Sequence, residues 1–388
     1  MSVHLIVAGG GIGGLALALS AAAHGHRVTV LERGRTFTEL GAGIQLAPNG
    51  LHALERLGVG AAVKAIAVGV EELRLFDGVT GEHVTSLPLD ERYRQRFGNP
   101  YVVVHRGELY RLLLDACRTA AGVELRAASP VAGYSQGGSG ATALLADGRR
   151  VTGTLLVGAD GIHSAIRAQL AGDGPPRVSG ITVYRSIVPI AAVPESLRAS
   201  AVTWWAGPGC HFVHYPIAGG RLLNLAASRD DGATEAFAGR DASAEHVLGE
   251  LGALTAARPL LELGRDWKSW VLVDRPPIPQ WTDGRVTLLG DAAHPMLHYA
   301  AQGACQALED AVLLGGLLHR GPDGLREYQD RRRERTAAIQ HVSRDSIRLW
   351  HPAGDAARAR NAALGALSAD ELHDAVAWMH AGRIGASA

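Results

Sequence analysis

The sequence predicts an α/β fold with a discontinuous Rossmann-like domain, an inserted β-rich domain and a C-terminal helical segment. Two observations lead to this prediction. Continuous apolar strands with adjoining helices, typical of a parallel sheet, lie within residues 1–50, 150–170 and 284–320. Between them, Ile181 to Ser228 alternates apolar and polar residues, which is typical of antiparallel strands with one exposed face. One α/β domain interrupted by a β-rich domain explains this order.

The first unit of the predicted parallel sheet is the clearest. His4 to Ala8 has the apolar run of a buried strand, Ile12 to His24 is an alanine-rich helix, and Arg27 to Leu31 is a second strand. Later segments follow the same rules, and the chain ends in a helical tail from Pro352. The other expected elements are a helix at Leu109–Ala120, a strand at Val151–Val157, a turn at Gln136–Gly140 before a strand at Ala141–Leu145, a strand at Val286–Leu289, and helices at Gln302–His319 and Leu325–Trp350.

Composition excludes several classes of protein. Of 388 residues, 47% are hydrophobic and 20% are charged, so the chain can bury large cores. Basic and acidic residues balance at 38 each, which argues against a nucleic-acid binder. No signal peptide and no apolar run long enough to span a membrane are visible, so we expect a cytoplasmic protein. The cysteines are scattered without a CxxC pair, which indicates neither a disulfide framework nor a metal site; they are Cys117, Cys210 and Cys305.

A glycine-rich turn follows the first strand. Gly9 to Gly14 reads GGGIGG, a GxGxxG motif that ends a strand and opens a helix. Gly9 permits the tight turn, Gly11 lets the backbone approach a pyrophosphate, and Gly14 lets the helix pack against the strand. The phosphates then lie at the positive end of the helix, beside Ile12 and Gly13. Glu32 ends the second strand, where a carboxylate can bind the ribose hydroxyls of an adenosine.

The identity of the dinucleotide depends on a second signal. Arg33 beside Glu32 would suit the 2′-phosphate of NADP. A distant strand, however, ends in Gly290-Asp291 and leads to a helix that starts at Gln302 with Gly303 and Ala304. A carboxylate there suits the hydroxyls of a ligand that extends across the whole domain. FAD needs such a second site, whereas NAD does not.

Three ordered motifs, at Gly9–Gly14, Gly158–Gly161 and Gly290–Pro295, resemble those of the single-component flavoprotein aromatic hydroxylases. The resemblance covers roughly residues 1–345. It implies that Asp291 binds the ribitol of FAD and that Asp160 serves both FAD and the nicotinamide. It also implies that Arg106 contacts the flavin side of the cofactor and that the loop containing Gln45 lies beside the flavin ring. No second GxGxxG unit is present, so NADH or NADPH binds transiently.

Within that family the chain is most similar to hydroxylases of small hydroxylated aromatic acids, among them 3-hydroxybenzoate 6-hydroxylase, salicylate hydroxylase and 6-hydroxynicotinate 3-monooxygenase. This similarity rests on residues 211–216, on His294-Pro295 and on residues 301–305. Relatives of the 3-hydroxybenzoate branch often carry Gln where this chain has His298 and Tyr299, which leaves the substrate open. Gln302, His298 and Tyr299 are the candidates for holding it.

His211 and Tyr215 are the candidate catalytic residues. On a strand, His211, Val213 and Tyr215 point to one face and His214 points to the other. With Trp204 and Trp205 nearby, they could form an aromatic wall around a substrate. The alternative is a sheet face packed against a helix, in which His211 and Tyr215 only satisfy each other. The resemblance favours the first interpretation, with His211 as the base that deprotonates a phenol.

The predicted function is an FAD-dependent monooxygenase that hydroxylates a small phenolic or heteroaromatic acid with NAD(P)H and O₂, through a flavin C4a-hydroperoxide. The alternatives are a flavin epoxidase or hydroxylase of a larger natural product with the same fold, and a flavin dehydrogenase or oxidase without oxygen insertion. The oligomeric state stays open, with a homodimer among the alternatives. We assign residues 1–75, 100–175 and 276–345 to the FAD-binding domain, 76–99 and 176–275 to the substrate domain, and 346–388 to C-terminal helices.

Overall fold

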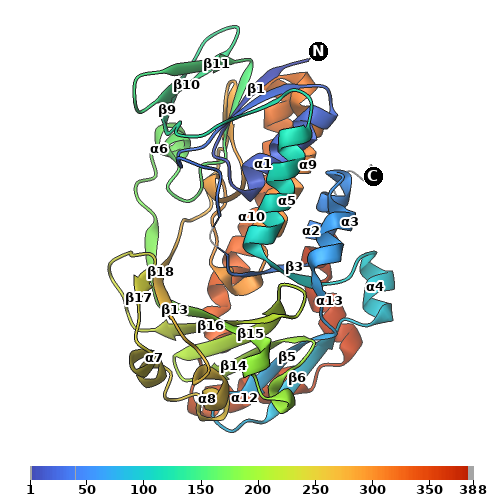
Figure 1. The fold of residues 1–388 in the computed structure, drawn as a ribbon, viewed down its shortest axis with the longest axis vertical. Coiled ribbons are helices and arrows are strands. Elements are labelled where there is room, and N and C mark those ends of the chain that lie inside the picture. The colour runs from blue at the N-terminus through green and yellow to red at the C-terminus, as the bar shows by residue number, and fades with distance from the viewer. Residues whose placement is uncertain (1, 40, 383–388) are drawn as a thin grey trace.

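The two largest sheets lie at opposite ends of the molecule, and several long helices lie beside the first of them (Figure 1). The computed structural model describes residues 2–39 and 41–382. The first sheet has six strands, of which all but the edge strand β19 run parallel to their neighbours. In spatial order they are β19 (Thr282–Asp283), β20 (Val286–Leu288), β12 (Leu155–Gly158), β1 (His4–Ala8), β2 (Arg27–Leu31) and β8 (Val123–Arg126). The predicted α/β fold is therefore confirmed.

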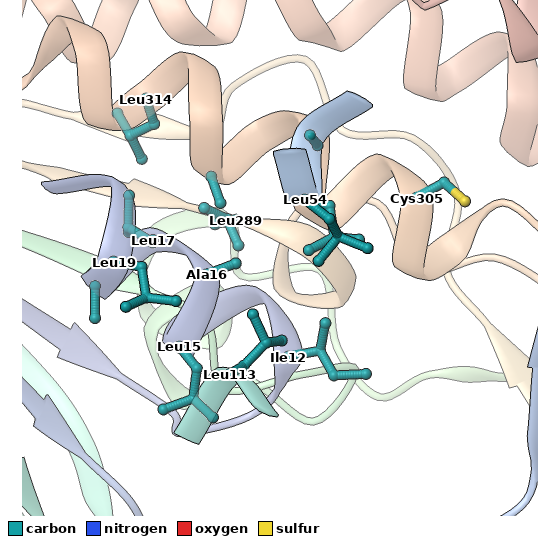
Figure 2. Packing of buried hydrophobic residues seen from close by; sticks show 14 of the residues in the cluster. Ile12, Leu15, Ala16, Leu17, Leu19, Leu54, Leu113, Leu289, Cys305 and Leu314 are labelled. Carbon is teal, nitrogen blue, oxygen red and sulfur yellow. The ribbon is translucent and has the colours of Figure 1, made fainter. Parts of the chain in front are cut away.

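Helix α1 (Ile12–Ala23) packs against the parallel sheet and against the helices α9 (Gly303–Leu317) and α5 (Arg106–Thr119). Its buried residues interdigitate with Leu289 and Leu314 (Figure 2). The close approach of helix and strand requires glycine, because a Cβ on Gly14 would lie 2.0 Å from the carbonyl oxygen of Gly9. Gly9 itself has φ +108°, a conformation that other residues rarely adopt. The glycines of the GxGxxG motif therefore allow the start of α1 to pack directly against the end of β1.

The second sheet has eight strands and forms the other end of the molecule (Figure 1). Its order is β17 (Arg240–Asp241), β18 (Lys268–Asp274), β13 (Arg177–Pro189), β16 (Leu222–Asp230), β15 (Cys210–Ile217), β14 (Ala201–Gly207), β5 (Glu72–Asp77) and β6 (His83–Pro88). The expected antiparallel pairing within 181–228 is confirmed. The expectation of half-exposed strands is wrong for β15, which is buried along its whole length. One of its faces packs on a core with α7 (Ala244–Glu250) and α8 (Arg258–Leu261), and the other faces the first domain.

The segment predicted as one strand at Val151–Val157 is two strands in different sheets. β11 (Arg150–Gly153) pairs with β10 (Ala141–Leu145), and β12 pairs with β1. The chain turns at Thr154, whose amide donates a hydrogen bond to the carbonyl of His4 over 2.7 Å. The sequence did not reveal the break, because no charged residue or proline separates the two halves between Val151 and Val157. The turn predicted at Gln136–Gly140 does join β9 (Val131–Gln136) to β10.

The remaining elements lie between the sheets and at the C-terminal end. A small sheet contains β3 (Gly43–Leu46), β7 (Val102–His105) and β4 (Val68–Gly69). The long helix expected at Leu325–Trp350 is α10 (Pro322–Asp345) followed by the separate short helix α11 (Ile347–Trp350). At the break, the Ser346 hydroxyl donates to the Val342 carbonyl over 2.7 Å, a contact that bends helices. The other helices are α2 (Pro48–Arg56), α3 (Gly60–Ile66), α4 (Glu91–Phe97), α6 (Ala165–Ala171), α12 (Gly354–Gly365) and α13 (Ala369–His380).

Candidate active site

A cavity of about 390 Å³ lies between the glycine-rich turn and the eight-stranded sheet. Its wall combines the start of α1, strand β3, one face of β13 to β16, and the segment from Leu289 to Ala307. These segments are far apart in the sequence. Thirteen of the predicted site residues line it: Gly11, Ile12, Gly13, Gln45, Arg106, His211, Tyr215, Asp291, His298, Tyr299, Gln302, Gly303 and Ala304.

Five predicted cofactor residues lie outside this wall. Gly9 and Gly14 form the contact between β1 and α1 described above. Glu32 directly follows β2 beside the turn, where its carboxylate accepts hydrogen bonds from the amides of Gly10 at 2.9 Å and Gly34 at 2.7 Å. Arg33 is exposed. Asp160 accepts a hydrogen bond from the amide of Ala165 at 2.8 Å and thereby caps α6, while its Oδ1 is buried without a partner among the described residues.

The cavity wall suits an extended dinucleotide at both ends. At the turn, a Cβ added to Gly11 would meet no atom within 4 Å, so the backbone there is open to a phosphate. At the far end, Asp291 lies in the short turn Gly290–Ala292 and faces the cavity. Desolvation by the surrounding protein raises the pKa of this carboxyl, against the opposing effects of His294 and Arg106. A ligand hydroxyl that donates to Asp291 would relieve that cost.

The strand β15 presents its predicted face to the cavity. His211, Val213 and Tyr215 all line it. His214 points to the other side, where its ring centroid lies 5.5 Å from that of Phe212. The alternation expected from the sequence is therefore confirmed.

The expectation that both Trp204 and Trp205 contribute to the cavity wall is wrong for Trp205. Trp204 lines the cavity, whereas Trp205 points to the opposite face and stacks on Phe76 at 4.8 Å. Adjacent residues of a strand cannot share one face. Trp350, from the C-terminal helices, stacks on Trp204 instead, at 5.8 Å.

His211 is 1% exposed and pairs with a residue that the sequence did not suggest. Its Nδ1 lies 2.9 Å from Nε2 of His351, which follows α11. Burial, with the charges of His351 and His298, holds the pKa of His211 well below its ordinary value. His211 is therefore neutral at neutral pH, the form that a base requires.

Tyr215 and His298 are neutral for the same physical reason. Burial raises the pKa of Tyr215 to about 12, although Arg185 and a hydrogen bond from Gln45 oppose that rise. Burial and the charge of Arg185 lower the pKa of His298 to about 3. Tyr215 also packs closely on β3, because a Cβ on Gly43 would lie 2.4 Å from its ring.

Arg185 is a second residue that sequence reasoning missed. It lines the cavity from β13, and within the described residues no hydrogen bond or ion pair holds its guanidinium. Its guanidinium carbon lies over the ring of Trp270, 5.7 Å from the ring centroid. Burial lowers the pKa of Arg185, so the cation is destabilised where it stands. The sequence feature that could have revealed Arg185 is a single charged residue among the otherwise uncharged residues from Ile181 to Val188.

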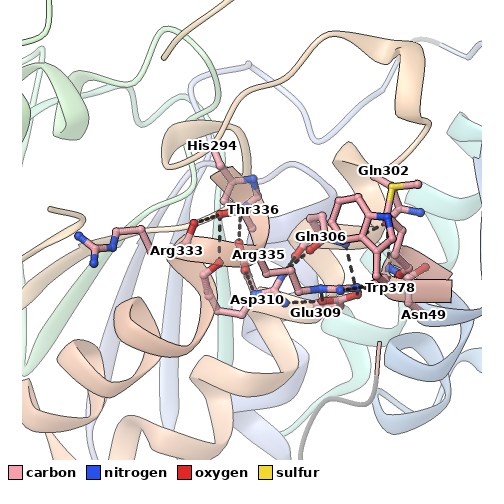
Figure 3. A network of polar contacts seen from close by, with 12 residues as sticks. Asn49, His294, Gln302, Gln306, Glu309, Asp310, Arg333, Arg335, Thr336 and Trp378 are labelled. Carbon is pink, nitrogen blue, oxygen red and sulfur yellow. Dashed lines mark hydrogen bonds and ion pairs between the residues drawn. The ribbon is translucent and has the colours of Figure 1, made fainter. Parts of the chain in front are cut away.

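A buried polar network fixes the orientation of Gln302 (Figure 3). Its Oε1 accepts hydrogen bonds from Asn49 and Gln306, both at 2.9 Å. Its Nε2 is buried without a partner among the described residues. Since Gln302 lines the cavity, the side chain offers N–H donors to a bound molecule rather than an acceptor.

Two carboxylates and an arginine form the centre of this network. Arg332 pairs with Glu309 and, over 2.7 Å, with Asp310. Asp310 in turn accepts hydrogen bonds from His294 at 2.6 Å and from the amide of Gly290 at 3.0 Å. His294 therefore makes a structural hydrogen bond with Asp310. The network therefore supports both the turn that carries Asp291 and the side chain of Gln302.

Comparison with known proteins agrees with this arrangement. Residues 2–343 match the family described as FAD binding domain. The chain belongs to this FAD-binding family. It is 44% identical to 3-hydroxybenzoate 6-hydroxylase 1 of Aquipseudomonas alcaligenes over 98% of each chain. It is 40% identical to 3-hydroxybenzoate 6-hydroxylase of Polaromonas naphthalenivorans over 98% of this chain and 96% of the relative.

Solved structures extend the similarity to the whole fold. A salicylate hydroxylase substrate complex superposes with a TM-score of 0.84 at 26% identity, covering 99% of this chain and 97% of that one. HpxO of Klebsiella pneumoniae, complexed with FAD and uric acid, gives a TM-score of 0.83 at 26% identity, covering 96% and 95%. The flavoprotein is an FAD-dependent aromatic hydroxylase, as predicted. Within the described residues, no helix is both long and apolar enough to cross a bilayer.

Replacing Asp291 with alanine is expected to weaken FAD binding by roughly 1–3 kcal/mol, because an acceptor for a ligand hydroxyl disappears from the cavity wall. The dissociation constant, measured by flavin fluorescence during titration of the apoprotein, should rise about 10- to 100-fold. The control is Asp283→Ala, because Asp283 lies in the edge strand β19 and does not line the cavity. Unchanged FAD affinity in the Asp291 variant would mean that this carboxylate does not hold the cofactor.

Proposed function

We propose that this hydroxylase acts on 3-hydroxybenzoate, or a closely related small phenolic acid, and adds a hydroxyl group para to the phenol. It would use FAD, O₂ and NADH or NADPH. The observation that carries the proposal is a single cavity wall that combines a neutral histidine, His211, with a cation, Arg185, that forms no ion pair within the described part of the chain. The relatives named for 3-hydroxybenzoate and the salicylate hydroxylase complex support the same substrate class.

The strand register supports this pairing of groups with one small acid. Ser228 of β16 lies between His211 and Val183, and Ala226 lies between Val213 and Arg185. Arg185 is therefore two strands across and one two-residue step along from His211, which corresponds to roughly 12 Å between Cα atoms. Both side chains extend into this gap, and the small Ala226 beneath it leaves room. An aromatic ring with a hydroxyl at one end and a carboxylate at the other fits the gap.

The proposed chemistry assigns one task to each group. A phenol has a pKa of about 10, as tyrosine has, so a base must remove its proton at neutral pH. His211 Nε2 is the nitrogen left for that proton, because Nδ1 is occupied by His351. Arg185 would pair with the carboxylate, and Gln302 would donate to a substrate oxygen. Bound FAD, once reduced, supplies the activated oxygen, and the buried wall excludes water from it.

The remaining proposed roles follow from position. Tyr215 would hold or relay the phenol proton beside His211, while His298 and Tyr299 would pack against the substrate. Gly11, Ile12, Gly13, Gly303 and Ala304 would contact the phosphates of FAD, and Arg106 and Gln45 would lie beside the flavin. We also propose the division into an FAD-binding domain, a substrate domain and C-terminal helices given above. The free thiols of Cys117, Cys210 and Cys305 support a reducing, cytoplasmic location.

NADH or NADPH oxidation should be slow in the purified enzyme and rise sharply when the correct acid is added. The physical reason is that the sequence carries a single GxGxxG unit, at Gly9–Gly14, so we expect the nicotinamide to bind transiently and flavin reduction to depend on a filled substrate site. A screen of hydroxybenzoates, aminohydroxybenzoates and hydroxynicotinates, followed by product analysis, tests the proposal. Equal rates of anaerobic flavin reduction with and without each acid would contradict it. Reduction without a hydroxylated product would favour a flavin oxidase.

Replacing Arg185 with glutamine should weaken binding of 3-hydroxybenzoate about 10- to 100-fold, because a charged hydrogen bond contributes about 1.5–3 kcal/mol. A phenol that lacks the carboxylate, such as 3-hydroxybenzyl alcohol, should bind equally to the variant and the wild type. Arg240 to glutamine, at an exposed edge of the same sheet, is the control. Equal losses for the acid and the alcohol would show that Arg185 does not recognise the carboxylate.

A further inference from the structure

The contact between His211 and His351 joins two ring nitrogens that cannot both play the same part. Nδ1 of His211 and Nε2 of His351 are 2.9 Å apart, so a single proton lies between them. Either His211 donates from Nδ1, or His351 donates from Nε2. The nitrogen of a neutral imidazole that carries the proton is set by the hydrogen bond made at the other nitrogen. His351 therefore controls which tautomer His211 adopts.

Only one of these arrangements lets His211 act as a base. If His211 donates from Nδ1, its Nε2 is unprotonated and faces the cavity with a lone pair. If His351 donates, His211 carries its own proton on Nε2 and can accept nothing from a phenol. The proposed deprotonation therefore requires His351 Nε2 to be the acceptor and His351 Nδ1 to carry a proton.

His351 lies closer to solvent than His211 does. His211 is 1% exposed, whereas His351 is only half-buried and follows the last turn of α11. Nδ1 of His351 has no partner among the described residues, and a buried N–H without one costs about 1–3 kcal/mol. A water molecule at this nitrogen would satisfy it and connect the pair to solvent.

Burial and the neighbouring charges keep the rings of His211 and His351 neutral before substrate binds. Arg229 of β16 lies near His351, and its charge is partly offset by Glu250 of α7 at 3.7 Å. His298 and Tyr299 cover the other side of His211 with ring centroids at 6.0 and 5.2 Å, and Asp230 lies beyond Tyr299. Burial and Arg229 lower the pKa of His351 to about 4, so a proton placed there is released readily.

We propose that His351 is a positioning and proton-relay residue for His211, an inference that rests on the proposed function. It accepts a hydrogen bond from His211 Nδ1–H and thereby keeps Nε2 free. When the phenol proton binds to Nε2, the Nδ1 proton moves to Nε2 of His351, and His351 releases its own Nδ1 proton to water. One proton enters and one leaves, no electrons are exchanged, and both histidines end neutral with their tautomers exchanged. Rotation of the two imidazole rings, or transfer of a proton back through water, restores the original tautomers.

The tautomer can be measured without turnover. Long-range ¹H–¹⁵N NMR spectra of the histidine-labelled holoenzyme, with His211→Gln to assign the resonance, should show His211 protonated at Nδ1 and not at Nε2. His351→Phe removes the acceptor and should give a mixture of tautomers, whereas His351→Gln retains an acceptor oxygen and should preserve the wild-type state. The control is His341→Phe at an exposed position of α10. A proton on Nε2 in the wild type, or an unaltered spectrum in His351→Phe, overturns the inference.

The relay is tested by proton release on binding of 3-hydroxybenzoate, followed with an indicator dye in a stopped-flow instrument. Release should be about 10- to 1,000-fold slower in both His351→Phe and His351→Gln, because neither side chain can take up a proton. If His351→Gln released the proton as fast as the wild type, a hydrogen-bond acceptor at this position would be enough for proton release. That result would overturn the relay. If the wild-type enzyme binds no phenolic acid, the proposed function fails, and the NMR measurement alone decides the role of His351.

Discussion

Hydroxylation should fall about 10²- to 10⁴-fold when His211 is replaced by alanine, because that is the usual contribution of a general base. FAD binding should be unchanged, since the motifs assigned to the cofactor lie in other segments of the chain. Product formed per bound FAD, measured alongside the melting temperature of the same preparation, separates chemistry from stability. His214→Ala on the opposite face of β15 is the matched control, because it removes a buried histidine without changing the cavity wall.

The pH dependence of the His211 variant gives a second test. In the wild type, the lowered pKa of His211 keeps the base neutral as pH falls through 6.5, so its protonation should not reduce the rate there. In His211→Ala, the rate should instead rise with pH, as solvent ionises the phenol toward its pKa of about 10. Near-wild-type turnover per flavin across this range would remove His211 from the mechanism. Equal activity loss in His214→Ala would point to packing instead.

Replacing Arg332 with leucine should destabilise the folded protein by about 3–5 kcal/mol, because two buried carboxylates lose their main counter-charge. The side chains of Glu309 and Asp310 are 1% and 0% exposed. Burial alone would raise the pKa of Asp310, but the charges and hydrogen bonds of His294 and Arg332 hold it well below its ordinary value. The free energy of unfolding, from urea denaturation, measures the effect. Lower FAD affinity should accompany it, because Asp310 supports the turn of Asp291.

Arg331 to leucine is the matched control for this experiment. Arg331 lies on the same helix and pairs with Glu327 at 3.4 Å, but its side chain is 45% exposed. Exposed ion pairs contribute little, so the change should stay within about 1 kcal/mol. Arg332→Lys should be intermediate, because lysine keeps the charge but cannot bind two carboxylates and Gln306 with one planar group. A stable Arg332→Leu protein would show that the carboxylates are neutralised in another way.

Local sequence patterns were sufficient for the first strand–helix–strand unit of the protein. The strand at His4–Ala8 and the helix after it were predicted almost to the residue, because hydrophobic periodicity and the GxGxxG glycines act over short distances. The alternation along β15 likewise placed His211 and Tyr215 on one face. The single strand predicted at Val151–Val157 is wrong, because no charged residue or proline separates its two halves and only their pairing with different sheets divides them.

The sequence by itself determined the fold class and the FAD-binding motifs, since each strand, helix and glycine-rich turn is encoded in a short run of consecutive residues. The candidate base His211 came from the alternation along one strand together with the family resemblance. Tertiary structure alone brought His351 to within 2.9 Å of His211, 140 positions away, and placed Arg185 in the cavity wall without an ion-pair partner among the described residues. It also fixed which end of the Gln302 amide faces the cavity, through hydrogen bonds from Asn49 and Gln306. The physical reason is that the partners of a buried polar group come from other elements, and no local periodicity records which elements will meet.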